Sequence, residues 1–405
     1  MNIDEQVEYL MQGTEYGDDN LKTAMTRELR ERLVEAQKEG RPLRVYCGFD
    51  PRTADLHLGH TVPMRKMRQF QELGHDVVFL VGNFTSLIGD PSDKDVLRPQ
   101  LTAEQVAENA RTYAEQAYRI LEKDKTRIAF NAEWLSKLTF EDLIKLSSNF
   151  TIQQFLTREN FRKRWDKGDA LYMHELFYSI MQGYDAYALK ADVQIGGTDQ
   201  LFNIVTAARK IMTYLDAKPN IAIILGILPG TDGTVKMSKS LGNHIPILTG
   251  PEDMYGKVMS IPDAAMPQYS RLVTRWTPDV IHAMESALKE GTLHPRDAKM
   301  KLAWEITSAF YSDEAANDAQ EAFVRLFQKG DVPEEMAEFG LDAAMPLADL
   351  LVATGMAESK SQARRLIDQK GVKLDGEVLT DARAAVPHAG VLQVGKRNYV
   401  RIIEK

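Results

Sequence analysis

Hydrophobic and polar positions along the first 230 residues predict strands and helices in alternation. The predicted strands are short apolar runs, at 43–49, 76–81, 127–131, 192–195 and 221–228. The predicted helices are at 21–37, 58–73, 102–121 and 201–212. The first is rich in good helix formers, the second has polar and apolar residues at helical spacing, and the third opens with a capping box of Thr102 and Gln105. This alternation is typical of a parallel sheet with helices on both faces, and ligands of such sheets bind beyond the carboxyl ends of the strands.

The remaining segments are predicted to be helical or mixed. Residues 134–190 and 251 to about 328 have helical patterns, whereas 330–346 are polar and contain prolines, which indicates a linker. The last 59 residues predict two short helices and then strand-like pieces, at 372–374, 391–394 and 399–403. We expect four parts: a sheet domain at 1–230 with a helical insertion at about 134–190, a loop at 231–250, a helical domain at 251–335 and a C-terminal module at 345–405.

Composition excludes several classes of protein. The 405 residues are 44% hydrophobic and 27% charged, which is typical of soluble globular proteins. The longest apolar run, 221–228, is too short to cross a bilayer, and the acidic start of the sequence does not resemble a signal peptide. A single cysteine, Cys47, excludes an intramolecular disulfide and suits a reducing cytosol. We therefore expect a cytoplasmic protein with no membrane partner.

The charge distribution is uneven. The net charge of −8 argues against a protein that coats nucleic acid without sequence preference. From Leu341 onward the chain has 10 Lys and Arg against 8 Asp and Glu, a net charge of +2, so the preceding residues carry −10. A basic end on an acidic protein fits a local RNA-binding surface, although the difference is small.

Two histidines lie where the first predicted strand leads into a helix. His57 and His60 are three residues apart, which places them on one face of the first helical turn. The free N–H groups and the dipole of a helix start favour phosphates, and Gly59 leaves room for a ligand. Such a pair also fits a core, surface or metal position. However, the single cysteine and the scattered other histidines offer no third metal ligand at a recognisable spacing.

A second candidate stretch follows the last predicted strand of the sheet. The segment 231–243 is rich in Gly, Ser and Thr and contains Lys236 and Lys239. Lysine is a mobile point charge that suits phosphate, and small flanking residues allow a loop to close over a triphosphate. Taken alone, the segment is equally consistent with an ordinary solvated loop.

Together the two stretches resemble the signature motifs of class I aminoacyl-tRNA synthetases. His-Leu-Gly-His at 57–60 and Lys-Met-Ser-Lys-Ser at 236–240 occur in that order on a predicted parallel sheet. The intervening motifs are similar to those of bacterial tyrosyl-tRNA synthetases, at 46–51, 88–91, 178–185 and 194–200. The resemblance covers essentially the whole chain. Residues 347–379 resemble a small RNA-binding module named after a ribosomal small-subunit protein.

This resemblance implies a fold, an activity and a set of partners. The implied fold is α/β: a Rossmann-like parallel-sheet catalytic domain with a helical insertion, an all-helical domain and a small C-terminal α+β RNA-binding module. The implied enzyme is a tyrosine–tRNA ligase. It would activate L-tyrosine with ATP to tyrosyl-adenylate and pyrophosphate, and then transfer tyrosine to the 3′ end of tRNA(Tyr). Mg²⁺ would accompany ATP without a metal cage in the protein, and the family implies a homodimer.

The roles of family residues carry over by position. Tyr46 and Asp185 are expected to hydrogen-bond the phenol of tyrosine. Its ammonium group is expected to be held by Asp90, Tyr178 and Gln182, and its carboxylate side by Gln200. The residues expected to bind ATP are Cys47, Gly48, Asp50, Gly59, Gly197, Asp199, Ser238 and Lys239. The expected catalytic residues are His57, His60, Lys236, Lys239 and Thr53. The residues expected to bind RNA are Arg364, Arg365 and Lys373.

One local departure from the family concerns the γ-phosphate of ATP. The family has Asp-Pro-Thr, whereas this chain has Asp-Pro-Arg-Thr at 50–53. Either Thr53 supplies the hydroxyl one residue later or Arg52 replaces it. No general base is required for activation, because the amino-acid carboxylate is already the nucleophile and the site has only to position the reactants and stabilise charge.

Two alternative functions stay open from the sequence alone. The first is another enzyme with this signature, such as a tryptophanyl-tRNA synthetase or a small-molecule adenylyltransferase. Tyr46 with Asp185 favours a phenol over an indole, and the helical block and basic tail favour tRNA over a small acceptor. The second is a catalytically silent RNA-binding protein on the same scaffold, against which the intact histidine and lysine motifs argue.

Overall fold

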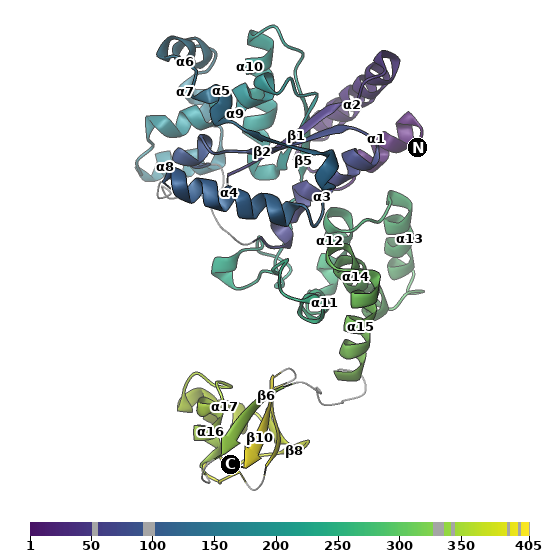
Figure 1. Cartoon of the computed structure of the whole chain (residues 1–405), viewed down its shortest axis with the longest axis vertical. Helices are drawn as coiled ribbons and strands as arrows, with labels where there is room; N and C mark the ends of the chain where they lie inside the picture. Colours follow the sequence, from purple (N-terminus) through teal and green to yellow (C-terminus); the bar gives the residue numbers. More distant parts are fainter. Residues whose placement is uncertain are drawn as a thin grey trace. The chain divides into compact units, whose positions relative to one another are not determined.

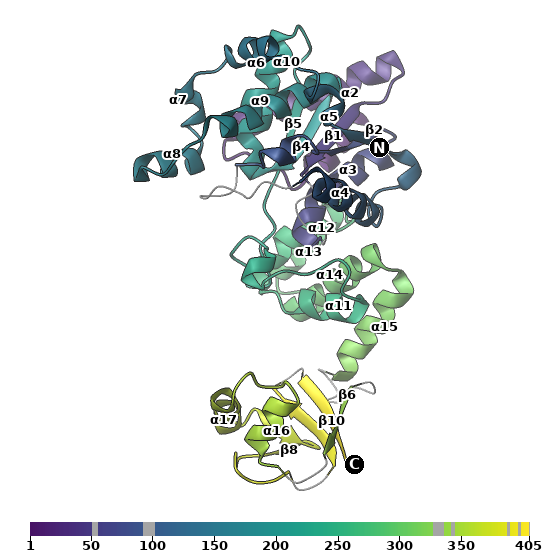
Figure 2. The same ribbon diagram turned by 60° about the vertical axis from the view of Figure 1, so that its left-hand side comes forward.

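The computed structural model describes residues 1–50, 56–91, 102–326, 336–341, 345–386, 389–395 and 398–404. The chain forms two compact units, Met1–Asn317 and Asp318–Lys405, and each is described by itself. Figures 1 and 2 show the course of the chain within each unit. In the part of the chain that the structure describes, no helix is long and apolar enough to cross a bilayer.

The first unit is built on a sheet of five parallel strands in the order β3-β2-β1-β4-β5. The strands are β1 Arg44–Phe49, β2 Asp76–Val81, β3 Thr126–Phe130, β4 Val193–Gly197 and β5 Ile221–Leu225. The predicted alternation of strands and helices is confirmed, because each strand falls within or beside its apolar run. The order of the strands reverses at β1 and β4, which places a ligand crevice beyond the carboxyl ends of these two strands.

Helices cover both faces of this sheet. The helices up to the last strand are α1 Ile3–Met11, α2 Asp19–Glu39, α3 Leu58–Glu72, α4 Ala103–Ala117, α5 Ala132–Leu135, α6 Phe140–Ser147, α7 Ile152–Phe155, α8 Glu159–Lys167, α9 Met173–Ala188 and α10 Arg209–Tyr214. Both views show α3 and α4 on one side of the sheet and α9 and α10 on the other (Figures 1 and 2). On the second side, Tyr46 and Val78 of the strands pack against Ala186 and Met212 of the helices. Burial of these apolar side chains holds the layers together.

Local signals set the ends of several helices. The predicted capping box of Thr102 and Gln105 is present at the start of α4. Gly40 ends α2 in the left-handed conformation, with φ of 66°, which a residue with a Cβ adopts only at a cost. The prediction of a helix over 201–212 needs one correction. The chain first forms a 3₁₀ turn, η3 (Thr198–Gln200), and a π-helix, η4 (Phe202–Ala208), before α10 begins at Arg209.

The helices after β5 belong to the same compact unit as the sheet up to Asn317. They are α11 Pro251–Met259, α12 Met266–Val273, α13 Pro278–Lys289, α14 Pro295–Phe310 and α15 Asp313–Val324. The shorter 3₁₀ turns are η1 Thr85–Leu87, η2 Lys123–Lys125, η5 Lys239–Leu241 and η6 Asp263–Ala265. The helical pattern predicted for this region is confirmed. Helix α12 packs on α3, so the helical region adjoins the element that begins at the histidine motif.

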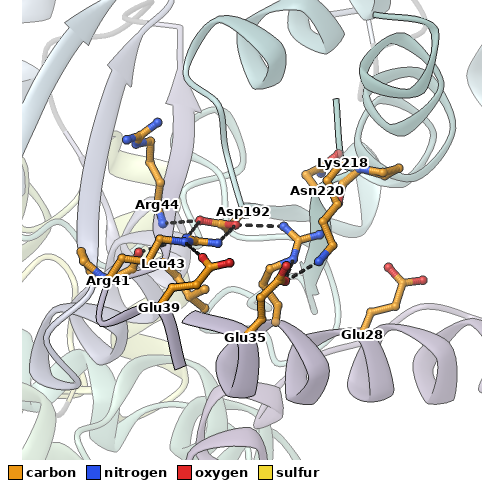
Figure 3. Close-up of polar contacts among 12 residues, drawn as sticks. Glu28, Glu35, Glu39, Arg41, Leu43, Arg44, Asp192, Lys218 and Asn220 are labelled. Atoms are coloured by element: carbon orange, nitrogen blue, oxygen red, sulfur yellow. Dashed lines mark hydrogen bonds and ion pairs between the residues drawn. The ribbon is translucent and has the colours of Figure 1, made fainter. Parts of the chain in front are cut away.

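A buried ion-pair cluster attaches α2 to the edge of the sheet opposite the carboxyl ends (Figure 3). Asp192 precedes β4 and accepts hydrogen bonds of 2.9 Å from Arg32 of α2, from Arg41 and from the backbone N–H of Arg44. Burial opposes ionisation of Asp192, but the hydrogen bonds from Arg41, the Arg44 N–H and Arg32 outweigh it and lower the pKa of this carboxyl. Asp192 is therefore charged in the folded protein at neutral pH.

Asp192→Asn is expected to lower the free energy of unfolding by about 3 kcal/mol at pH 7, because the buried Arg32 loses its charged partner. A carboxyl with a lowered pKa stabilises the fold above its ordinary pKa and loses that contribution as the pH falls, so the difference between variant and wild type should shrink in acid. Urea unfolding at several pH values measures this. Asp4→Asn, which breaks the exposed 2.7 Å pair with Arg30, is the matched control and should change little. Equal effects of the two substitutions would contradict this account.

The second unit begins within α15 and contains a small sheet in the order β6-β10-β9-β7-β8 together with the helices α16 and α17. Its elements are β6 Ala337–Leu341, α16 Leu347–Ala353, α17 Lys360–Asp368, β7 Val372–Leu374, β8 Glu377–Val378, β9 Gly390–Val394 and β10 Asn398–Glu404. The helices and strands predicted for this unit are present. The segment 330–346 was predicted to be a linker, but its residues Ala337–Leu341 form the strand β6. This strand pairs in parallel with β10, a partner about 60 residues away that no local pattern reveals.

Candidate active site

A cavity of about 570 Å³ lies at the carboxyl ends of β1, β4 and β5 and is bounded by the starts of α3 and η3 and by the loop before η5. Most of the residues expected to bind small molecules line it: Tyr46, Cys47, Gly48, Asp50, His57, Gly59, His60, Asp90, Tyr178, Gln182, Asp185, Gly197, Asp199, Gln200, Lys236 and Ser238. Lys239 begins η5 and is not among the lining residues. Thr53 and Arg52 lie outside the described residues, so the question of the γ-phosphate hydroxyl stays a prediction.

Two buried polar groups, Tyr46 and Asp185, line the inner end of the cavity. The Tyr46 hydroxyl, fully buried on β1, donates to the backbone oxygen of Gln182 at 3.4 Å. Asp185 of α9 accepts from the Trp134 indole N–H at 2.7 Å and from the Asn131 amide at 3.3 Å. Burial, only partly offset by these two donors, raises the pKa of Asp185 to about 7. Burial and the charge of Asp185 also raise the pKa of Tyr46. This end can therefore accept and donate hydrogen bonds to a hydroxyl group.

A second carboxylate is joined to the first through shared partners. Asp50 accepts hydrogen bonds from the Tyr178 hydroxyl at 3.0 Å and from the Thr85 hydroxyl at 2.8 Å. The Asn131 amide that donates to Asp185 also donates to Thr85 at 3.1 Å. Sequence reasoning missed Asn131, Thr85 and the indole donor at 134, because each acts through contact with a residue at least 35 positions away. The one signal in the sequence that could have indicated them is their position just after β2 and β3, at the carboxyl ends of the strands.

Acceptor groups gather at the side of the cavity next to η3. The amide nitrogen of Gln200 donates to the Asp90 carboxylate at 2.5 Å. The side-chain oxygen of Gln182 is buried and accepts no hydrogen bond from the described residues. A buried acceptor without a donor is costly, so a bound ligand with N–H groups would stabilise it. Tyr178 was also expected to hold the ammonium group of tyrosine. In the structure its hydroxyl donates to the Asp50 carboxylate at 3.0 Å.

The two histidines cap the helix on which they lie. His57 is the N-cap of α3, and its ring Nδ1 accepts from the backbone N–H of Gly59 at 3.2 Å. The backbone N–H of His57 donates to the ring Nδ1 of His60 at 3.3 Å. The rings stack with their centroids 3.7 Å apart. Burial, reinforced by His60, lowers the pKa of His57 to about 3, so this imidazole is neutral near pH 7. Because Nδ1 of each ring accepts a hydrogen bond, each ring has its proton on Nε2, where it can donate to an anion.

The loop that contains Lys236 and Lys239 has a buried residue at its centre and a half-exposed lysine beside it. Met237 is buried, whereas the Lys236 side chain is 48% exposed and its ammonium lies 3.6 Å from Asp199. The Ser238 N–H donates to the Asn243 side-chain oxygen at 2.8 Å, and the Asn243 amide donates to Asp232. These hydrogen bonds hold the segment that follows Lys236 in place. Lys236 itself lines the cavity, where its ammonium can reach a ligand.

The residues expected to bind RNA lie in the second unit. Arg364 and Arg365 are exposed on α17, while Ala363 and Ile367 of the same helix are buried in the core of this unit. Lys373 is half-buried on β7. In the described part of the chain, no group of three or more His, Cys, Asp or Glu side chains is arranged to hold a metal ion.

Comparisons with known proteins agree with this geometry. Residues 37–328 match the family described as tRNA synthetases class I (W and Y), and residues 345–388 match the S4 domain. A relative from Thermotoga maritima named tyrosine–tRNA ligase is 47% identical over 92% of this chain and 93% of its own length. A relative of the same name from Geobacter metallireducens is 43% identical, with complete coverage of both chains.

Solved structures are similar at the level of the fold. The C-terminally truncated mitochondrial tyrosyl-tRNA synthetase of Aspergillus nidulans matches with a TM-score of 0.61 and 22% identity, over 80% of this chain and 94% of that one. The tyrosyl-tRNA synthetase of Archaeoglobus fulgidus, solved with L-tyrosine, matches with a TM-score of 0.59 and 20% identity, over 79% and 100%.

Proposed function

The chain belongs to the tyrosyl-tRNA synthetase family of class I, and we propose that the cavity between β1 and β4 is where it joins L-tyrosine to ATP. It is a tyrosine–tRNA ligase, which forms tyrosyl-adenylate and pyrophosphate and then transfers tyrosine to the 3′ end of tRNA(Tyr). The observation that carries the site assignment is that the buried Tyr46 hydroxyl and the buried Asp185 carboxyl, close enough for the charge of Asp185 to raise the pKa of Tyr46, line the same cavity as the histidine and lysine motifs. Such a site accepts a phenol at one end and a triphosphate at the other.

Tyrosine is held at both ends. Its hydroxyl would donate to Asp185 and accept from Tyr46, which replaces the weak 3.4 Å contact of Tyr46 with a backbone oxygen. Its ammonium group would be held by the Asp90 carboxylate and the unpaired oxygen of Gln182. An indole of tryptophan would place a ring N–H at the deep end and has no acceptor for the Tyr46 hydroxyl. The geometry therefore favours tyrosine among the aromatic amino acids.

Activation is an in-line attack of the tyrosine carboxylate oxygen on the α-phosphorus of ATP, with pyrophosphate as the leaving group. The stacked rings of His57 and His60 would donate Nε2 protons to the phosphates at the start of α3, where the helix dipole also favours negative charge. Lys236 would leave Asp199 and bind the departing pyrophosphate, and Lys239 would follow it as the loop closes. Mg²⁺ would enter as part of the ATP substrate, held mainly by phosphate oxygens and water.

Transfer to tRNA uses the second unit as an additional contact. Exposed arginines of an S4 domain are suited to phosphate groups of RNA. A homodimer is proposed from the exposed apolar side chains of the helical insertion, Phe140, Ile144, Ile152, Trp165 and Met173, which a second copy would cover. Sedimentation should then give twice the mass of one chain. Because the acceptor is tRNA and the chain has one cysteine, we place the protein in the cytoplasm.

The double variant Arg364→Ala, Arg365→Ala is expected to raise the KM for tRNA(Tyr) about tenfold in charging assays, because two phosphate contacts are removed. Tyrosine-dependent exchange of pyrophosphate into ATP, which needs no tRNA, should stay unchanged. Arg27→Ala, an exposed arginine on α2 paired with Glu31, is the control for loss of surface charge. If the double variant had the wild-type KM for tRNA(Tyr), the prediction that these two arginines bind RNA would be wrong.

A further inference from the structure

Five side chains form a row of hydrogen bonds behind the cavity. Arg158 donates to the Ser179 hydroxyl at 3.1 Å, and Ser179 donates to the side-chain oxygen of Asn203 at 2.7 Å. The Asn203 amide nitrogen donates to the side-chain oxygen of Gln200 at 2.9 Å, and the Gln200 amide nitrogen donates to Asp90 at 2.5 Å. The row therefore begins at a guanidinium and ends at a carboxylate in the cavity.

The two ends of this row fix the direction of every bond in it. A guanidinium has only donors and a carboxylate has only acceptors. With Arg158 at one end and Asp90 at the other, each amide between them has a single orientation that satisfies both neighbours. Ser179 and Asn203 are fully buried and Arg158 is 7% exposed, so water does not compete for these bonds. A reversed Gln200 amide would turn its oxygen toward the Asp90 carboxylate and its nitrogen toward the nitrogen of Asn203, and both contacts would be repulsive.

The position of Arg158 does not follow from stability alone. Its guanidinium stacks between the rings of Phe161 and Phe202, at 4.5 and 5.4 Å from their centroids. Burial lowers the pKa of Arg158, and this is partly offset by the charge of Asp90. An apolar side chain would fill the same space without the cost of removing a charge from water. A buried charge at the origin of a directed row of hydrogen bonds indicates that the row serves the group at its far end.

Three separate elements bring the row together. Arg158 is the N-cap residue of α8, Ser179 lies in α9, and Asn203 lies in the π-helix η4. The π-helix begins at Phe202, directly after the 3₁₀ turn η3, which ends at Gln200, so Gln200 and Asn203 lie on either side of the change from one helix type to the other. π-Helical turns are rare and occur mostly near functional sites.

We propose that Arg158, Ser179 and Asn203 are positioning residues for the amino-acid head group. They hold Gln200 with its N–H groups toward Asp90 and the cavity, and they hold Asp90 where it can receive the ammonium group. The inference rests on the proposed function, in which Asp90 holds the ammonium group of tyrosine, and on the expectation from the sequence that Gln200 binds its carboxylate side. Neither the phenol end nor the phosphate end of the cavity depends on the row. Loss of the row should therefore weaken tyrosine binding and leave ATP binding unchanged.

Two substitutions break the row at different bonds. Asn203→Asp keeps the shape of the side chain but replaces the donor to Gln200 with an acceptor, which favours the reversed Gln200 amide. Ser179→Ala removes the bond between Arg158 and Asn203. Each is expected to raise the tyrosine KM in pyrophosphate exchange about ten- to a hundredfold, while the ATP KM stays within about twofold of wild type. Ser270→Ala is the matched control, since Ser270 is equally buried and, among the residues that the structure describes, its hydroxyl donates to the backbone oxygen of Pro267.

A second readout separates positioning from general loosening of the fold. 4-Ethylphenol has the phenol of tyrosine without the head group, so its inhibition constant should be the same in wild type, Ser179→Ala and Asn203→Asp. An inhibition constant that rises in step with the tyrosine KM would overturn the inference, as would an unchanged tyrosine KM in both variants. Absence of tyrosine-dependent exchange in the wild type itself would instead overturn the proposed function, and this inference with it.

Discussion

Asp185→Ala is expected to destroy selection between tyrosine and phenylalanine while ATP binding stays nearly normal. Asp185 is buried beside Tyr46 at the deep end of the cavity, and a bound phenol would pair with both groups. Phenylalanine would leave both groups without a partner, which is costly in a buried site. Tyrosyl-tRNA synthetases are themselves the standard example of this effect, with a discrimination of about 10⁵, so that value is taken over for this chain.

In the Asp185→Ala variant the tyrosine kcat/KM should fall at least about a hundredfold and the preference over phenylalanine by more, because the phenol loses its acceptor. The ATP KM should change less than about threefold. Trp134→Phe, which keeps a ring but removes the 2.7 Å donor to Asp185, should give a smaller loss of the same kind. Preserved discrimination in Asp185→Ala would refute the assignment of the phenol site.

The pKa of Asp185 adds a dependence on pH to the same prediction. Burial raises this pKa to about 7, so the empty site is partly protonated near neutrality. The ionised carboxylate is the better acceptor for a phenol hydroxyl, so tyrosine affinity should rise as the pH rises through about 7. In Asp185→Asn, which does not titrate, the rise should be absent. The tyrosine dissociation constant measured between pH 6 and 8 tests this directly.

Lys236→Ala is expected to slow adenylate formation by about 10²- to 10³-fold, the usual effect of removing one donor that stabilises developing charge. In the structure its ammonium pairs with Asp199 at 3.6 Å, its side chain is half-exposed, and it lines the cavity in which the phosphates are proposed to bind. The loss should fall on kcat, because the developing charge on pyrophosphate needs this lysine more than bound tyrosine does. The tyrosine KM should stay near the wild-type value.

Two matched variants sharpen the test of Lys236. Lys218→Ala removes an exposed lysine that pairs with Glu35 at the far edge of the sheet, and it should leave kcat unchanged. Lys236→Arg keeps the charge but replaces a compact ammonium with a planar group, so it should restore only part of the rate. Single-turnover formation of adenylate measures the chemical step alone. A full wild-type rate in Lys236→Ala would exclude the lysine from that step.

Much of the fold was predictable because the relevant signals are local. The five strands of the large sheet coincide with apolar runs, and the capping box of Thr102 fixes the start of α4. Two elements escaped prediction for physical reasons. The buried residues of the π-helix η4 recur four positions apart, at 203 and 204 and again at 207 and 208, which is a spacing that an α-helix also gives. Strand β6 is stabilised by pairing with β10, which lies far along the chain. Pairing between distant segments leaves no mark in the pattern of either one.

The candidate site was predictable from motifs, whereas its supporting contacts were not. The two histidines, two lysines and the phenol pair were expected from the resemblance, and the structure brings most of them to one cavity. The partners of these residues were not expected: Asn131, Trp134, Thr85, Arg158, Ser179 and Asn203. Each has an ordinary sequence context, and its role arises only when another element packs against it. Their positions on unrelated helices and turns are a consequence of the fold.

Amino-acid-dependent exchange of labelled pyrophosphate into ATP, without tRNA, tests the central claim most directly. Tyrosine, tryptophan and phenylalanine should be compared in parallel. We predict exchange with tyrosine alone, because only a phenol satisfies both Tyr46 and Asp185. Exchange with tryptophan in place of tyrosine would leave the nucleotide site standing and contradict the phenol assignment. No exchange with any of the three would contradict the claim that this cavity activates an amino acid.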